Sequence, residues 1–109
     1  MSQFFFARLS EATPGGPGRD LTRVTVGFGE TPATNAEIVP ATIGAFAALN
    51  LPGGKGLLIN GPMSIPSAFA AAHAVGHLFA FIAVWDPKLQ RYVVVISHNP
   101  DQKPGDLLS

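Results

Sequence analysis

Among the residues in the second half of the chain whose side chains are suited to acid–base catalysis, metal binding or charge neutralisation, five are the candidates for a shared site. They are His73, His77, Asp86, Lys88 and His98. Imidazole and carboxylate groups transfer protons and bind metal ions, and a lysine ammonium group can offset negative charge on a bound molecule. All three histidines of the chain lie in this stretch. We therefore treat it as the candidate site.

The spacing of the histidines suggests two arrangements. His73 and His77 are four residues apart in a segment expected to be helical, so both imidazoles would lie on one face and could share a metal ion or a phosphate. A metal site needs further ligands, and a helical histidine pair is more often structural. His98 ends the last long strand that we expect, at the same end of the domain as His77.

Asp86 and Lys88 are expected in a turn at the opposite end of the domain. The turn Asp86-Pro87-Lys88 joins two strands of about six residues, which separates it from His77 and His98 by ~20 Å. A site that uses both groups must then be assembled between subunits. The alternative remains open that Asp86-Pro87 only forms a turn and His98 only ends a strand, because Asp-Pro is a common turn dipeptide.

The elements that position these residues can be predicted from hydrophobic patterning. Short apolar or alternating runs predict strands, and alanine-rich segments predict helices. Glycine and proline clusters predict a flexible hairpin loop over 12–18 and a turn over 51–56. We expect strands at 4–9, 23–28, 56–60, 80–85 and 92–97, helices at 35–49 and 65–77, and an edge piece at 106–108.

Several details of these elements are also expected. The strands at 4–9 and 23–28 should pair. Those at 80–85 and 92–97 should be antiparallel, because the link is short, and buried on both faces. Asn35 can cap the first helix, although Pro40 favours a regular start nearer Val39. Its core-facing stripe is expected to consist of Ile43, Phe46, Ala47 and Asn50.

The loop before the second helix could bind phosphate. Free N–H groups and the helix dipole at a helix start favour anions, and donors could come from Asn60, Gly61, Ser64 and Ser67. Pro66 suits the first turn of that helix. Helix capping by the same polar residues is the alternative interpretation.

Composition limits the partners and the compartment. The 109 residues predict one domain, over 1–109, with no linker or repeat. Cysteine is absent, and acidic and basic residues balance, so a thiolate metal site and a polycation field for double-stranded DNA are not expected. No run is apolar enough to cross a membrane, and no signal peptide is apparent, which predicts a cytoplasmic protein. With 47% hydrophobic and 13% charged residues, we expect a homo-oligomer, and a monomer with an apolar exterior is the alternative.

Four motifs in order resemble those of a known family. They are Ile-Asn-Gly-Pro-x-Ser-x-Pro at 59–66, Ala-His-x-x-x-His at 72–77, Val-x-Asp-Pro-Lys-Leu at 84–89, and Val-Val-Ile-Ser-His-x-Pro at 94–100, with Gly-Asp at 105–106. Together they resemble the small stand-alone, manganese-dependent ring nuclease family of type III CRISPR systems. The resemblance covers roughly half of the chain and implies a small α/β domain, a mixed sheet with about two helices, distantly like the nucleotide-sensing (Rossmann-like) domains of those systems.

The resemblance also implies an activity and roles for residues. The expected protein is a homodimer that stacks with a second dimer around cyclic tetra-adenylate and cleaves this second messenger, which ends antiviral signalling. His77, Asp86 and Lys88 match catalytic positions, and Asp86 and His98 match positions linked to Mn²⁺. Substrate-binding positions are matched by Asn60, Gly61, Pro62, Ser64 and His73.

Two other functions are compatible with the same motifs. One is a non-catalytic module that binds cyclic oligoadenylate, and the other is a Mn²⁺-dependent exonuclease that removes adenylates from RNA tails. One departure from the family pattern is local: Gln90-Arg91 stands where glycine is common after Asp-Pro-Lys-Leu. That change should alter the turn that directs Lys88.

Overall fold

The computed structural model describes residues 3–10 and 21–108. They form a six-stranded sheet with two helices, in agreement with the predicted α/β class. The expected loop over 12–18 lies outside the described residues. The elements in chain order are β1 (Phe5–Ser10), β2 (Leu21–Phe28), α1 (Asn35–Ala48), β3 (Gly54–Asn60), α2 (Ile65–Val75), β4 (Phe79–Asp86), β5 (Arg91–Ser97) and β6 (Leu107–Leu108).

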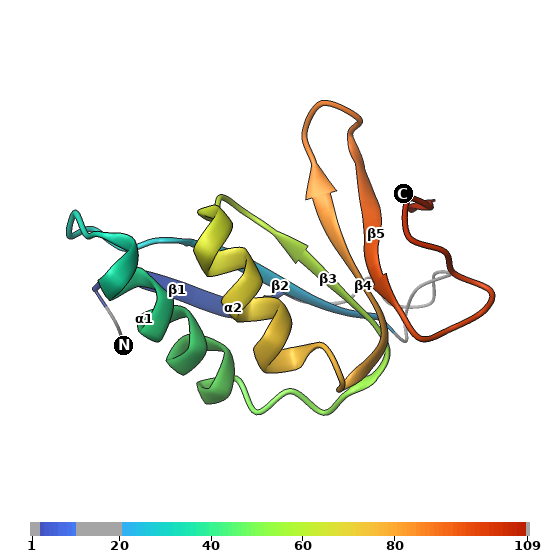
Figure 1. Cartoon of the computed structure of the whole chain (residues 1–109), viewed down its shortest axis with the longest axis horizontal. Helices are drawn as coiled ribbons and strands as arrows, with labels where there is room; N and C mark the ends of the chain where they lie inside the picture. Colours follow the sequence, from blue (N-terminus) through green and yellow to red (C-terminus); the bar gives the residue numbers. More distant parts are fainter. Residues whose placement is uncertain (1–2, 11–20, 109) are drawn as a thin grey trace.

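The sheet is mixed, and its strands follow the chain order from β1 to β6. β2, β3 and β4 are parallel, whereas β1–β2, β4–β5 and β5–β6 are antiparallel. The predicted pairing of β1 with β2 and the predicted antiparallel direction of β4 and β5 are both confirmed. The connections β2–α1–β3 and β3–α2–β4 both join parallel neighbours, and each moves the chain one strand further along the sheet. Because such connections have the same hand, both helices lie on the same face of the sheet. Figure 1 shows α1 and α2 side by side on that face.

Hydrophobic residues fill both sides of the sheet. The larger core lies under the helices, where strand residues such as Val24 and Leu57 meet Ile38 and Phe46 of α1 and Ala71 and Val75 of α2. A second cluster occupies the other side, with Leu58, Phe81, Ala83, Tyr92 and Val94. β4 contributes to both clusters, so its prediction as a strand buried on both faces is confirmed.

β5 differs from the prediction because it carries an irregularity. Ala83 pairs with Val94 and Ile82 pairs with Ile96, so Val95 is an extra residue on β5. Such a bulge leaves one residue without a cross-strand partner and turns the strand. Val95 is 46% exposed. β5 is therefore not buried on both faces, whereas the predicted edge piece at 106–108 is confirmed as β6.

The first helix begins earlier than Pro40 suggested. Thr34 is the N-cap, and the Glu37 carboxylate accepts hydrogen bonds from the Thr34 N–H at 3.1 Å and from its hydroxyl at 3.3 Å. This reciprocal cap starts the helix at Asn35, with Pro40 in its interior. The Ala36 carbonyl, four residues before Pro40, lies in an exposed part of the helix, where water can hydrogen bond to it.

The predicted core stripe of α1 is confirmed at Phe46 and wrong at Ile43, Ala47 and Asn50, which are exposed. The buried residues are Ile38, Thr42 and Phe46, whereas Ile43 is 46% exposed. The prediction missed Ile38 and Thr42, and Thr42 is the less expected of the two because it brings a hydroxyl into the core. Its hydroxyl donates to the Ile38 carbonyl at 2.8 Å, which satisfies the buried polar group within the helix.

Candidate functional site

His77 and His98 lie together at one end of the sheet, as their positions in the chain predicted. The His98 N–H donates to the Ala80 carbonyl at 2.7 Å, which extends the β4–β5 pairing past Ser97. The His98 ring nitrogen Nε2 lies 3.2 Å from the carbonyl oxygen of Gly76, the residue before His77. We call Gly76, His77 and His98 the histidine end. Sequence patterning missed the Gly76 contact, because it depends on a backbone carbonyl that no residue type reveals.

The Gly76 contact selects one tautomer of the His98 ring. A carbonyl oxygen only accepts hydrogen bonds, so Nε2 must carry the proton and donate it to Gly76. In the neutral ring Nδ1 then keeps its lone pair. The exposed His98 side chain can therefore offer Nδ1 to a metal ion or to a proton donor without breaking its contact with Gly76.

The prediction that His73 and His77 lie on one helix is wrong. α2 ends at Val75 with Gly76 as its C-cap, so His77 lies in the following turn. Glycine favours helix termination, which the alanine-rich pattern had obscured. Both histidines are exposed, and among the described residues neither ring has a hydrogen-bond partner. His77 therefore follows the residue that contacts His98, and it does not share a helix with His73.

Asp86 organises the turn at the opposite end of the sheet. Its Oδ1 atom accepts hydrogen bonds from the N–H groups of Lys88 at 2.9 Å and Leu89 at 3.1 Å. Its carbonyl accepts from the Gln90 N–H at 2.8 Å. We call residues 86–90 the aspartate turn. One carboxylate oxygen is thus occupied by the turn, while Oδ2 has no hydrogen-bond partner among the described residues, and Lys88 is exposed beside it.

The two ends are too far apart for one chain to combine them. Asp86 follows Ala80, which contacts His98, by six positions along β4, a distance of about 20 Å in a strand. In Figure 1 the turn of the β4–β5 hairpin points away from the C-terminal ends of α2 and β5, so the aspartate turn lies far from the histidine end. Among residues 3–10 and 21–108, no three His, Asp or Glu side chains are grouped closely enough to hold a metal ion.

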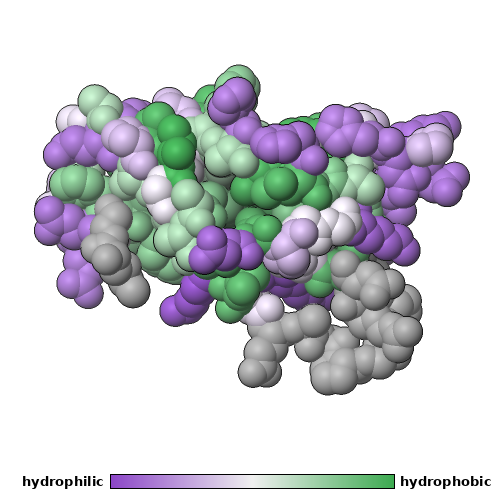
Figure 2. All heavy atoms as spheres, turned by 90° about the horizontal axis from the view of Figure 1, so that it is seen from below, coloured by the Kyte–Doolittle hydropathy of each residue, from purple (hydrophilic) through white to green (hydrophobic). Residues whose placement is uncertain are grey.

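Exposed apolar surface lies beside the histidine end. Leu78, which follows His77, is 38% exposed. Figure 2 views the molecule from this end and shows hydrophobic residues across the middle of the face, with most hydrophilic residues toward its edges. A partner that meets this face can therefore exclude water around the imidazoles, which strengthens electrostatic interactions there.

The loop of residues 60–64 is held rigidly at the C-terminal end of β3. Gly61 has φ +135°, and a Cβ placed on it would lie 1.9 Å from the Val26 carbonyl oxygen, so only glycine fits this passage against β2. Asn60 and Pro62 are exposed on either side of it. The loop therefore presents the Asn60 side chain from a fixed backbone.

Ser64 has a structural task in this loop. Its hydroxyl oxygen accepts from the Ser67 N–H at 3.2 Å, which makes Ser64 the N-cap of α2. Pro66 has no N–H, so the first turn keeps few free donors. Of the two interpretations, capping is the one that the structure supports for Ser64, and the helix start offers an anion little beyond the Ile65 N–H.

The turn that directs Lys88 contains a residue in an unfavourable conformation. Gln90 has φ +57°, in the left-handed region, at a position where the resemblance implies glycine. We expect Gln90→Gly to raise the free energy of unfolding by about 0.5–1 kcal/mol, because glycine adopts this conformation without a Cβ clash. Urea denaturation of the two proteins measures the difference. A loss of stability would show instead that the hydrogen bond from Gln90 Nε2 to the Pro87 carbonyl outweighs the strain.

Comparison with protein-family models identifies the family of this chain. Residues 32–109 match the family model described as CRISPR-associated protein (Cas_csx3). The chain belongs to the Cas_csx3 family. The Cas_csx3 match begins just before α1 and includes every residue of the candidate site, whereas β1 and β2 precede it.

The other comparisons add no further relatives. Neither the curated proteins nor the solved structures contain a significant match to this chain. Within the described residues, no helix is long and apolar enough to cross a membrane. The CRISPR association of this Cas_csx3 protein therefore rests on the family match, and its chemistry must be argued from the site.

Proposed function

We propose that this protein is a ring nuclease that binds and cleaves cyclic tetra-adenylate and so ends type III CRISPR signalling. The family match supports the CRISPR association. The observation that supports the mechanism is the separation of the two half-sites, the histidine end and the aspartate turn, by about 20 Å in one chain. A complete site then requires the histidine end of one subunit to meet the aspartate turn of another, with the ligand between two stacked dimers.

The residues divide the reaction between the two half-sites. Cleavage of a phosphodiester forms a bond from phosphorus to a ribose 2′-hydroxyl or a water, and breaks the bond to the 5′-oxygen. The proton that the nucleophile loses is matched by the proton that the leaving oxygen gains. His77 is the proposed proton-transfer group, because its ring is exposed and unpaired among the described residues, and Lys88 offsets the charge that develops on the phosphate.

The donor atoms at the two ends fit Mn²⁺. Oδ2 of Asp86 and Nδ1 of His98 have no hydrogen-bond partner among the described residues, and together they would offer the mixed oxygen and imidazole set that suits this ion. When bound, the ion would polarise the phosphate oxygens as a Lewis acid. Both donors would bind the ion without giving up their structural hydrogen bonds, so each half-site would be preorganised before the subunits meet.

Asn60, Gly61 and Pro62 are the proposed ligand-facing residues, from the rigid loop after β3. His73 is proposed to contact the ligand as well, from the exposed side of α2. The Ser64 hydroxyl oxygen already caps α2, so its proposed role is to hold the loop and not to donate to a phosphate. The balanced net charge is compatible with a compact anion held by a few repeated donors.

One assay separates this function from its alternatives. Turnover of cyclic tetra-adenylate is compared with turnover of linear poly-adenylate, each with Mn²⁺ and with a chelator. The proposal expects cleavage of the ring with Mn²⁺ and little cleavage of the linear chain. Preferred cleavage of poly-adenylate would favour the exonuclease, and tight binding of the ring without cleavage would favour the binding module.

A further inference from the structure

Within the described part of the chain, the first strand of the sheet has one edge without a partner strand, and a groove lies beside this free edge. β1 pairs with β2 alone among the described residues. The Gly29 N–H donates to the Phe4 carbonyl at 3.0 Å, so the Phe4 backbone faces β2. Backbone groups alternate in direction along an antiparallel pair. The N–H and carbonyl groups of Phe5, Ala7 and Leu9 therefore point away from the sheet.

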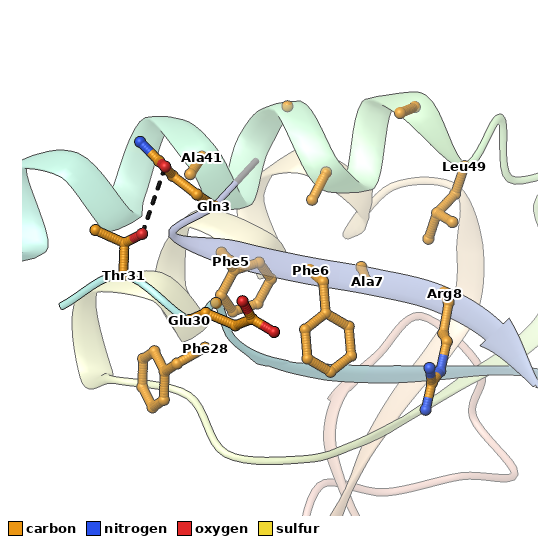
Figure 3. A pocket seen from close by; sticks show the side chains of 14 residues that line it. Gln3, Phe5, Phe6, Ala7, Arg8, Phe28, Glu30, Thr31, Ala41 and Leu49 are labelled. Atoms are coloured by element: carbon orange, nitrogen blue, oxygen red, sulfur yellow. Dashed lines mark hydrogen bonds between the residues drawn. The ribbon is translucent and has the colours of Figure 1, made fainter. Parts of the chain in front are cut away.

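The groove follows this edge between β1 and α1. It has a volume of about 980 Å³ and is lined on the helix side by small residues: Ala41, Gly44, Ala45 and Ala48. Figure 3 shows β1 running beneath α1, with Phe6 and Arg8 pointing to the side away from the helix. A second strand placed against β1 would hydrogen bond to the free edge and place alternate side chains in the space beneath α1.

The charges at the groove are arranged so that a two-fold axis makes them complementary. Arg8 lies toward one end, near Leu49, and Glu30 lies toward the other end, near Thr31 (Figure 3). A two-fold axis through the middle of β1 exchanges the ends, so each arginine approaches the partner's glutamate. An isologous contact requires this kind of self-complementary surface.

The exposed Leu9 side chain fits the same arrangement. Leu9 is 52% exposed in one chain, at the end of β1. Its side chain lies on the same side as those of Phe5 and Ala7, which pack toward α1. If Ala7 pairs with the partner's Ala7, the partner's Leu9 pairs with Phe5 and enters the groove beside the small residues of α1.

The register is also selected on the other side of the strand. With Ala7 opposite the partner's Ala7, Arg8 lies opposite the partner's Phe6, and the Arg8 guanidinium already stacks on its own Phe6 ring at 5.4 Å. A register centred on Arg8 would place two arginines opposite each other, which is unfavourable. A register centred on Phe6 would place Leu9 opposite the partner's Gln3, which is exposed, and not opposite the partner's Phe5.

We propose that β1 is a homodimer interface in which two copies pair their first strands antiparallel, with Ala7 on the two-fold axis, to form one continuous sheet. The two helical layers then lie on the same face of that sheet. The proposal concerns a part of the fold that precedes the family match and does not depend on the proposed function.

Sedimentation velocity of the full chain without ligand tests this interface. The wild type should sediment as a dimer, and Leu9→Lys should raise its dissociation constant by at least ~100-fold, because both copies lose an apolar contact. Phe69→Lys, at a 74% exposed position on the helical layer, is the matched variant and should leave the dimer intact. A monomeric wild type, or dissociation by Phe69→Lys and not by Leu9→Lys, would overturn the proposal.

A cross-linking experiment tests the register independently of charge and of the stability of Leu9→Lys. The chain has no cysteine, so a single cysteine reports one contact. Ala7→Cys should be joined to its partner rapidly by a short bis-maleimide, because opposed residues in such a pair have Cα atoms about 5.5 Å apart. Val95→Cys, exposed on the β5 bulge, should remain uncoupled under the same conditions. Equal rates at the two positions would contradict the proposed register.

Discussion

Ring cleavage by the Asp86→Asn variant is expected to fall by at least about 100-fold, because the variant loses the negative charge that would bind Mn²⁺. Asparagine keeps the side-chain oxygen that accepts from the Lys88 and Leu89 N–H groups. The aspartate turn should therefore remain folded. Initial rates with cyclic tetra-adenylate, together with urea denaturation, measure the two effects separately.

Asp86→Ala is the informative comparison for this variant. It removes both turn hydrogen bonds as well as the charge, so it should lose activity and also some stability. His77→Ala should lose about 10²–10⁴-fold in rate with little change in stability, because its exposed ring has no partner among the described residues. Full activity in Asp86→Asn and His77→Ala would show that neither side chain acts in the reaction.

Gly61→Ala is expected to cost about 3 kcal/mol or more of unfolding free energy. Two effects add at this position. The backbone has φ +135°, which alanine rarely adopts, and the new methyl group would lie 1.9 Å from the Val26 carbonyl oxygen on β2. The loop that carries Asn60 must shift to relieve this clash, so ligand binding should weaken too. Urea denaturation measures the first effect and ligand titration the second.

Gly54→Ala is a matched control at the other end of β3. Gly54 has φ +142°, close to the value at Gly61, but a Cβ there meets nothing within 4 Å. This variant should therefore suffer the conformational strain alone and lose clearly less stability than Gly61→Ala. Equal losses of unfolding free energy in the two variants would mean that the clash between the new methyl group and β2 adds nothing to the conformational strain.

Most of the strands could be predicted because their residues leave few alternatives. Runs such as Tyr92 to Ile96 are too short and too β-branched for helices, and the brief Asp86–Arg91 link permits only an antiparallel pair. The same reasoning placed His77 and His98 at one end and Asp86 at the other. Strand direction alone determined that separation.

The predicted boundaries of the helices and the burial of β5 were wrong where a local structural feature outweighs the hydrophobic pattern. The Thr34–Glu37 cap starts α1 ahead of Pro40, and Gly76 ends α2 before His77. The bulge at Val95 could not be predicted, because it is a property of two paired strands and not of either sequence. The tautomer of His98 likewise depends on a backbone carbonyl brought close by folding.

The most direct test of the central claim is complementation between two inactive variants. His77→Ala retains an intact aspartate turn, and Asp86→Asn retains an intact histidine end, so neither protein alone forms a complete site. If the half-sites come from different subunits, an equal mixture combines intact halves at roughly a quarter of its contacts and regains about that share of the wild-type rate with cyclic tetra-adenylate. A mixture no more active than its components would contradict assembly of the site between subunits.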